Sequence, residues 1–173
     1  MKKIARELFW WIKTLAIALV CAILINNTLI AHAQVISGSM ESTIMTGSRV
    51  MGSRISYVLN QPERFDIILF DPPYDAPMLY VKRIIGLPNE TVVIIDGNVY
   101  IDGSNIPLDD SFINEPARGN YGPFFVPNGS YFVMGDNRNR SSDSRHWANS
   151  FVPHENIVGR LYFEYFPTPH FFE

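Results

Sequence analysis

The apolar segment at residues 8–30, LFWWIKTLAIALVCAILINNTLI, limits the possible folds more than any other feature of the sequence. As a helix it would be roughly 34 Å long, enough to cross a bilayer core of about 30 Å. Lys2, Lys3 and Arg6 precede it, and basic residues of this kind stay on the cytoplasmic side. The sequence therefore predicts a cytoplasmic N-terminus over residues 1–7, a transmembrane helix over 8–30 and an extracytoplasmic domain over 31–173.

A cleaved signal peptide is the alternative interpretation of the same segment. Ala31-His32-Ala33 fits the small-x-small pattern that ends such peptides. Their apolar cores usually span about 7–15 residues, fewer than are found here. A tryptophan pair near the start of the run is also typical of a membrane interface. These features favour a retained anchor, and a cut after Ala33 stays open as the alternative.

Charge and composition narrow the classes of function. Of 14 basic residues, four lie within residues 1–30 with one of the 17 acidic residues, so the remainder is clearly acidic. An acidic domain does not favour nucleic-acid binding, which needs clustered Lys and Arg. Cys21 is the one cysteine, and the four histidines form no metal-binding spacing. We therefore expect no nucleic-acid partner, no metal and no cofactor.

Short β-branched and aromatic runs dominate after the apolar segment, each ended by Gly, Pro, Asn or Asp. The strands that we predict are 48–52, 65–70, 79–85, 91–95, 98–101, 130–134 and 157–165. They indicate a mainly β fold, with an antiparallel sheet folded into a barrel-like domain behind one N-terminal helix. The stretch 104–129 is rich in Pro, Gly, Asn and Asp, and is either a long loop or a small subdomain.

Ser37-Gly38-Ser39-Met40 is the first candidate for chemistry. Ser and Gly are common in turns, so a plain loop leaving the membrane is one interpretation. A nucleophilic serine would instead need a nearby base to take its proton.

The segment LYVKRII at residues 79–85 offers such a base. Alternation along a strand puts Lys82 and Arg83 on opposite faces, and both faces are otherwise apolar. On an edge strand both cations could extend to water. If Lys82 is buried, desolvation lowers its pKa and makes it a competent general base, which Arg83 cannot be.

The segment MGDNRNRSSDSRHW at residues 134–147 is dense in Asp, Asn, Ser and Arg. A solvated loop with local hydrogen bonds is one interpretation. The other is a polar network beside a site, with Asp136 paired to Arg138 and Asp143 paired to Arg145. A serine of this loop could then hold the lysine in place.

These three blocks, in this order behind an apolar helix, resemble the bacterial type I signal (leader) peptidases, in particular the compact Gram-positive form. The resemblance runs over most of residues 8–165. It implies that Ser39 is the nucleophile, Lys82 the general base and Ser37 an oxyanion donor, while Ser141 orients the lysine. It further implies supporting roles near the site for Asp136, Arg138, Asp143 and Arg145.

The resemblance also implies a substrate, the signal peptide of an exported preprotein, cut after a small-x-small sequence such as Ala-x-Ala. Shallow apolar pockets would accept alanine and reject larger side chains. The wall positions that match are Val35, Ile36, Met40, Ile44, Leu69, Tyr80 and Val81. The expected partners are these signal peptides, the bilayer of the cell membrane and the protein-export machinery.

Three positions depart from the family pattern. Ser42 stands where Pro is usual, Phe65 where Gly is common before Asp66, and Asn139-Arg140 where an Asp-Asn pair is frequent. Phe65 is expected to reshape its strand and shift substrate preference. A different class of protein also fits the sequence: a membrane-anchored β-rich surface or assembly protein without peptidase activity.

Overall fold

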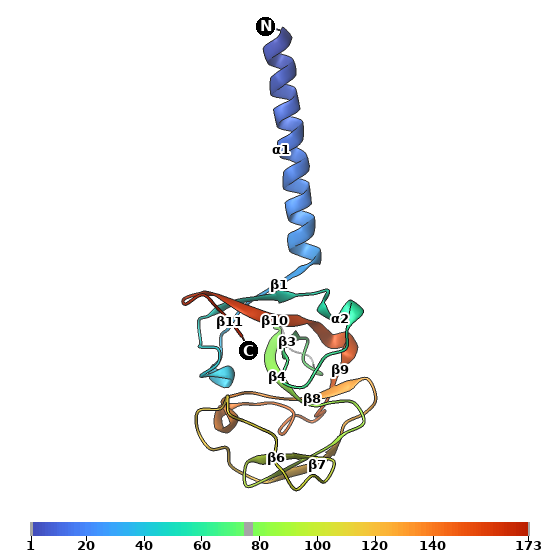
Figure 1. Ribbon diagram of the computed structural model, residues 1–173, viewed down its shortest axis with the longest axis vertical. Coiled ribbons are helices and arrows are strands. Elements are labelled where there is room, and N and C mark those ends of the chain that lie inside the picture. Colours follow the sequence, from blue (N-terminus) through green and yellow to red (C-terminus); the bar gives the residue numbers. More distant parts are fainter. Residues whose placement is uncertain (1, 75–77, 173) are drawn as a thin grey trace.

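The computed structural model describes residues 2–74 and 78–172, and residues 1, 75–77 and 173 lie outside them. Helix α1 (Lys2–Thr28) extends away from a β-rich domain (Figure 1). Its segment Arg6–Thr28 is long and apolar enough to cross a membrane, and none of its most apolar window is buried against the rest of the protein. The helix ends two residues before the predicted boundary at residue 30, because Ile30 already belongs to a strand.

An eight-stranded sheet forms most of the domain, and all of its paired strands are antiparallel. Its order is β1-β2-β10-β3-β4-β8-β9, with β11 beside β10, and the sheet curls below the end of the helix (Figure 1). The strands are β1 (Ile30–Gln34), β2 (Arg49–Ser53), β3 (Ile67–Phe70), β4 (Tyr80–Gly86), β8 (Ser130–Met134), β9 (Val152–Pro153), β10 (Ile157–Phe166) and β11 (His170–Phe171). The predicted fold class, mainly β and antiparallel with one N-terminal helix, is confirmed.

A second sheet of three strands, in the order β6-β5-β7, lies at the end of the domain away from the helix (Figure 1). Its strands are β5 (Thr91–Ile95), β6 (Asn98–Ile101) and β7 (Tyr121–Phe125). Asp96 and Gly97 form the β5–β6 turn with positive φ of 49° and 82°, as a tight hairpin requires. The stretch 104–129 thus supplies β7 to a small sheet and is not simply a long loop.

Four short helices complete the part of the chain that the structure describes. They are η1 (Gly38–Met40), α2 (Ser56–Leu59), η2 (Arg138–Arg140) and η3 (His154–Asn156). Two of them, η1 and η2, lie at the site described below.

Strand β1 is one of the elements that the sequence did not predict. Ala31 pairs with Gly52 of β2 and is fully buried, so the small-x-small segment is built into the sheet. Gly52 also faces β10 so closely that a Cβ would come 2.0 Å from the Arg160 carbonyl oxygen. A glycine is therefore needed at position 52, and Ala31, its partner in β1, is packed in the core.

Candidate active site

Ser39 lies in η1, in the connection between β1 and β2. Met40 and Ile44 hold this turn against the domain, because both are buried in one core cluster with Val35. Within the turn the Glu41 N–H donates to the Gly38 carbonyl oxygen at 3.2 Å. Ser39 is 8% exposed, so its hydroxyl lies at the surface of the protein core and not on a free loop.

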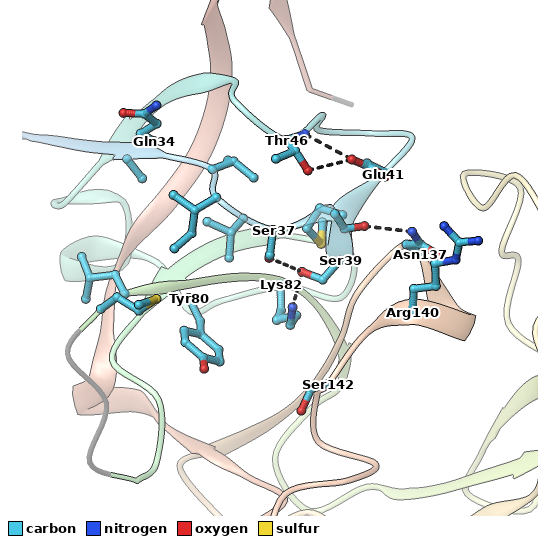
Figure 2. Close-up of a pocket in the computed structure, with 18 residues that line it drawn as sticks. Gln34, Ser37, Ser39, Glu41, Thr46, Tyr80, Lys82, Asn137, Arg140 and Ser142 are labelled. Atoms are coloured by element: carbon cyan, nitrogen blue, oxygen red, sulfur yellow. Dashed lines mark hydrogen bonds between the residues drawn. The ribbon is translucent and has the colours of Figure 1, made fainter.

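Lys82 reaches Ser39 from the neighbouring strand β4. Lys82 and Arg83 are both buried, so the alternative in which both cations extend to water is wrong. The Lys82 Nζ and Ser39 Oγ atoms lie 2.5 Å apart and are hydrogen-bonded, as Figure 2 shows. Burial lowers the pKa of Lys82 to about 8, against the opposing effect of the Asp143 carboxylate. A hydroxyl in contact with an amine of this pKa is suited to nucleophilic chemistry.

Arg83 points to the opposite face of β4 and is also buried. It makes two hydrogen bonds of 2.9 and 2.7 Å with the Asp136 carboxylate. Asp136 also accepts a hydrogen bond of 2.6 Å from Thr43, four residues after Ser39. Strand β4, the loop after β8 and the turn that carries Ser39 are thereby joined through one carboxylate.

The predicted pairing of Asp136 with Arg138 is wrong. Arg138 pairs instead with Asp110, with hydrogen bonds of 2.5 and 2.9 Å. The Phe112 ring lies under the Arg83 guanidinium at 4.1 Å, so the 104–129 stretch covers the charges behind the site. Both arginines find acidic partners that are distant in the sequence, which local spacing cannot reveal.

The pairing of Asp143 with Arg145 is present in the structure, with hydrogen bonds of 2.8 and 2.9 Å. Burial by itself would raise the pKa of Asp143, but the Arg145 guanidinium and the Gly135 N–H hold it below its usual range. Asp143 is therefore ionised at neutral pH and keeps Gly135, at the end of β8, in place through a hydrogen bond of 3.1 Å.

The two supporting serines differ in what they contact. Ser37 Oγ lies 3.3 Å from Ser39 Oγ. Ser141 Oγ is buried but makes no hydrogen bond with any described residue, so the expected contact with the Lys82 amine is not made in this structure. Its hydroxyl lies near enough to the Asp143 carboxylate to help lower that pKa, but without hydrogen-bond geometry.

Gly135 is a site residue that the sequence did not single out. A Cβ built there would lie 2.3 Å from the Ser39 carbonyl oxygen and 2.4 Å from Ser141 Oγ. No side chain fits at that distance, because one of the two neighbours is backbone and the other is buried.

An open groove of about 620 Å³ passes over Ser39 (Figure 2). Glu41, Asn137 and Arg140 lie together at one end of the groove, the polar end, and Gln34 and Tyr80 lie on the other side of Ser39 (Figure 2). The apolar residues of the lining include Ala33, Val35, Ile36, Met78, Leu79 and Val81.

Five of the seven expected wall residues, Val35, Ile36, Met40, Tyr80 and Val81, line this groove. Ile44 and Leu69 do not line it, because both are fully buried in the core cluster below.

Phe65 does not line the groove either. It adopts a φ of 73°, a region that favours glycine, and packs edge-to-face on Phe112 with centroids 5.6 Å apart. Its carbonyl oxygen accepts a hydrogen bond of 2.9 Å from Arg83. The structure therefore links Phe65 to the charges behind the site, and its expected effect on substrate preference would have to be indirect.

On one side of the groove, the edge of β4 beside Ser39 has no strand partner within the described residues. Tyr80, Val81 and Lys82 pair with β3 on one side, whereas the pairing of β4 with β8 begins at Arg83. An extended peptide could therefore add to β4 beside Ser39. Among the described residues no three His, Cys, Asp or Glu side chains gather in a way that could hold a metal ion.

The sequence matches the family model of signal peptidase, peptidase S26, over residues 8–166. It is 42% identical to the probable signal peptidase I-2 of Synechocystis sp. over 91% of this chain and 72% of that protein. It is 35% identical to the signal peptidase I of Bacillus licheniformis over 93% and 90% of the two chains. The chain therefore belongs to the signal peptidase family S26, and it is a serine peptidase.

A solved structure shows the same fold. The crystal structure of a signal peptidase I from Enterococcus faecalis V583 superposes with a TM-score of 0.50 at 35% identity. The match covers 58% of this chain and 97% of the Enterococcus faecalis chain.

Proposed function

We propose that this chain is a membrane-anchored serine endopeptidase that removes N-terminal signal peptides from exported preproteins, with Ser39 as nucleophile and Lys82 as general base. Membership of the signal peptidase family supports the removal of signal peptides. The observation that carries the assignment of residues is the 2.5 Å contact between Ser39 Oγ and the buried Lys82 Nζ. The dyad works without histidine, as other serine–lysine peptidases do.

The chemistry follows from the pKa of the lysine. Lys82, with a pKa of about 8, is partly neutral near pH 7 and takes the hydroxyl proton as Ser39 Oγ attacks the scissile carbonyl. The Ser39 N–H and the Ser37 hydroxyl stabilise the oxyanion that forms. The lysine ammonium then protonates the leaving amine, and a water molecule activated by the same lysine releases the acyl group.

The groove accounts for specificity. The signal peptide lies extended along the free edge of β4, with its small residues in shallow pockets against Val35, Met40 and Val81. Ile44 and Leu69 form a buried floor beneath these pockets and keep them shallow. A side chain larger than alanine would meet this packed core, which is why a small-x-small sequence is preferred.

Helix α1 keeps this groove at the membrane surface. Its segment Arg6–Thr28 spans the cell membrane with the basic N-terminus in the cytoplasm and the catalytic domain outside. The partners are then exported preproteins, the bilayer and the export machinery that delivers them.

The test is processing of a labelled preprotein by the full chain in detergent. Ser39→Ala and Lys82→Ala should each abolish cleavage, whereas Ser104→Ala, at an exposed serine in the 104–129 stretch, should cleave like the unaltered protein. Retained cleavage in either dyad variant would refute the dyad. No cleavage by the unaltered chain at any ratio would favour the surface-protein alternative.

A further inference from the structure

Asn137 makes two hydrogen bonds to the backbone on either side of the nucleophile. Its side-chain Nδ2 donates to the Gly38 carbonyl oxygen at 2.9 Å, and its own N–H donates to the Ser39 carbonyl oxygen at 3.1 Å. Because a carbonyl oxygen only accepts, the amide nitrogen is the atom that faces Gly38. Figure 2 shows the side-chain bond at the polar end of the groove. One residue from a loop almost a hundred positions away thus holds both carbonyl groups.

The first of these bonds fixes the direction of the proposed oxyanion donor. Gly38 C=O and Ser39 N–H belong to one planar trans peptide unit, so the two groups point in opposite directions. Holding the Gly38 oxygen against Asn137 turns the Ser39 N–H the other way. That N–H donates no hydrogen bond to any other described residue and is therefore available to a substrate oxygen.

The bond also ties the donor to the strand that carries the base. Asn137 follows Asp136, whose carboxylate is bound to Arg83, and Arg83 is the neighbour of Lys82 on β4. The bond from Glu41 N–H to the same Gly38 oxygen lies within the turn, so it cannot set the orientation of the turn relative to β4. The Thr43–Asp136 bond also connects the turn to β4, but Asn137 makes the connection that reaches the Gly38 carbonyl oxygen itself.

We propose that Asn137 is a positioning residue that aims the Ser39 N–H at the oxyanion through its hydrogen bond to the Gly38 carbonyl oxygen. This inference rests on the proposed peptidase function. It makes a distinct prediction: loss of the Asn137 amide weakens binding of the transition state, leaves ground-state binding intact and does not change the titration of Lys82.

The test compares Asn137→Ala with Asn139→Ala in the full chain. Asn139 lies in the same loop, but its amide binds Glu115 and the Pro116 carbonyl oxygen, away from the nucleophile. We expect Asn137→Ala to lower kcat about tenfold or more with KM changed less than about twofold, since loss of a whole oxyanion donor costs about 10²–10³ in kcat. Asn139→Ala should keep the kcat of the unaltered protein.

Two further measurements separate positioning from a general loss of structure. A peptide aldehyde adds to Ser39 as a tetrahedral adduct that needs the oxyanion donor, whereas the corresponding peptide alcohol binds without reaction. Asn137→Ala should raise the Kd of the aldehyde by the same factor as it lowers kcat/KM, and should leave the Kd of the alcohol and the pH midpoint of the rate profile unchanged. Partial misfolding would reduce the number of binding sites but leave the aldehyde Kd unaltered.

Asn137→Asp provides a second variant of nearly the same shape, with an acceptor in place of the donor. If Asn137→Ala does not fold, this variant should show the same loss of aldehyde affinity. Unchanged kcat and aldehyde affinity in a folded Asn137 variant would overturn the inference, as would an equal loss for aldehyde and alcohol. The dyad would stand in both cases, because its own test is cleavage by Ser39→Ala and Lys82→Ala.

Discussion

Replacing Lys82 by methionine should stabilise the folded protein at neutral pH while abolishing its activity. The lysine is 4% exposed, and burial lowers its pKa from 10.5 to about 8. Methionine has a similar length and carries no charge, so it removes the desolvated ammonium without leaving a large cavity. No carboxylate loses its only partner, because Asp143 stays paired with Arg145 and Asp136 with Arg83.

The size of the effect follows from the pKa values. A lowered lysine pKa means that the folded state binds protons less readily than the unfolded state, so the group destabilises the fold wherever it is charged in both. Between 10.5 and about 8 the difference amounts to about 3 kcal/mol, since one pKa unit is worth about 1.4 kcal/mol. This penalty is complete below about pH 8 and fades as the pH rises to about 10.5, where the unfolded lysine also becomes neutral.

The assay is chemical denaturation of the full chain in detergent at pH 7 and pH 10, comparing Lys82→Met with Ser39→Ala. Both variants are expected to be inactive and to lack the bond between Ser39 and Lys82, but Ser39→Ala retains the buried amine. Lys82→Met should exceed Ser39→Ala in unfolding free energy by about 3 kcal/mol at pH 7 and by about 1 kcal/mol at pH 10. An equal gain at both pH values, or none at pH 7, would refute a desolvated lysine at this site.

Three other outcomes follow from the same geometry. Gly135→Ala should abolish most activity and lower the unfolding free energy by about 1–3 kcal/mol in denaturation experiments, because its Cβ would lie 2.3 Å from the Ser39 carbonyl oxygen; wild-type activity would show that the loop can move aside. The cleavage rate should rise about tenfold from pH 7 to pH 9 as Lys82 loses its proton around pH 8, and a flat profile would contradict its role as base. N-terminal sequencing of stored active enzyme should find no new start at Gln34, because Ala31 and Ala33 are paired with β2; a start there would show that β1 opens.

Three strands were accessible from the sequence with their full bounds. The runs at 91–95, 98–101 and 130–134 are strands with those same bounds, because β-branched and aromatic residues in short segments favour a sheet. Strand β7 was not predicted, since Tyr121–Phe125 contains glycine and proline and is a strand only through its pairing with β5. Strand β1 was not predicted because its two alanines fit the cleavage motif of a signal peptide, and this pattern gave no indication that they belong to a strand.

The dyad residues were also accessible, as a serine and a lysine in recognisable blocks, but the identity of their neighbours was not. Arg83 and Arg138 each lie near several carboxylates in the sequence, and only the folded chain brings Asp136 to the first and Asp110 to the second. Gly135 and Asn137 contact backbone atoms of the turn that carries Ser39. A contact of that kind depends on where the main chain passes, which side-chain patterns do not encode.

Helix α1 passes almost directly into strand β1, so the fold fixes the distance between the end of the helix and Ser39. Thr28 ends the helix, Ile30 begins the strand, and Ser39 follows only nine residues later. If α1 is anchored as proposed, the height of Ser39 above the bilayer is set by folded structure, because β1 is paired with β2, and it cannot drift as it would on a flexible stalk. A preprotein is then cut where its chain reaches that height, so the length of its membrane-embedded segment helps select the bond that is broken.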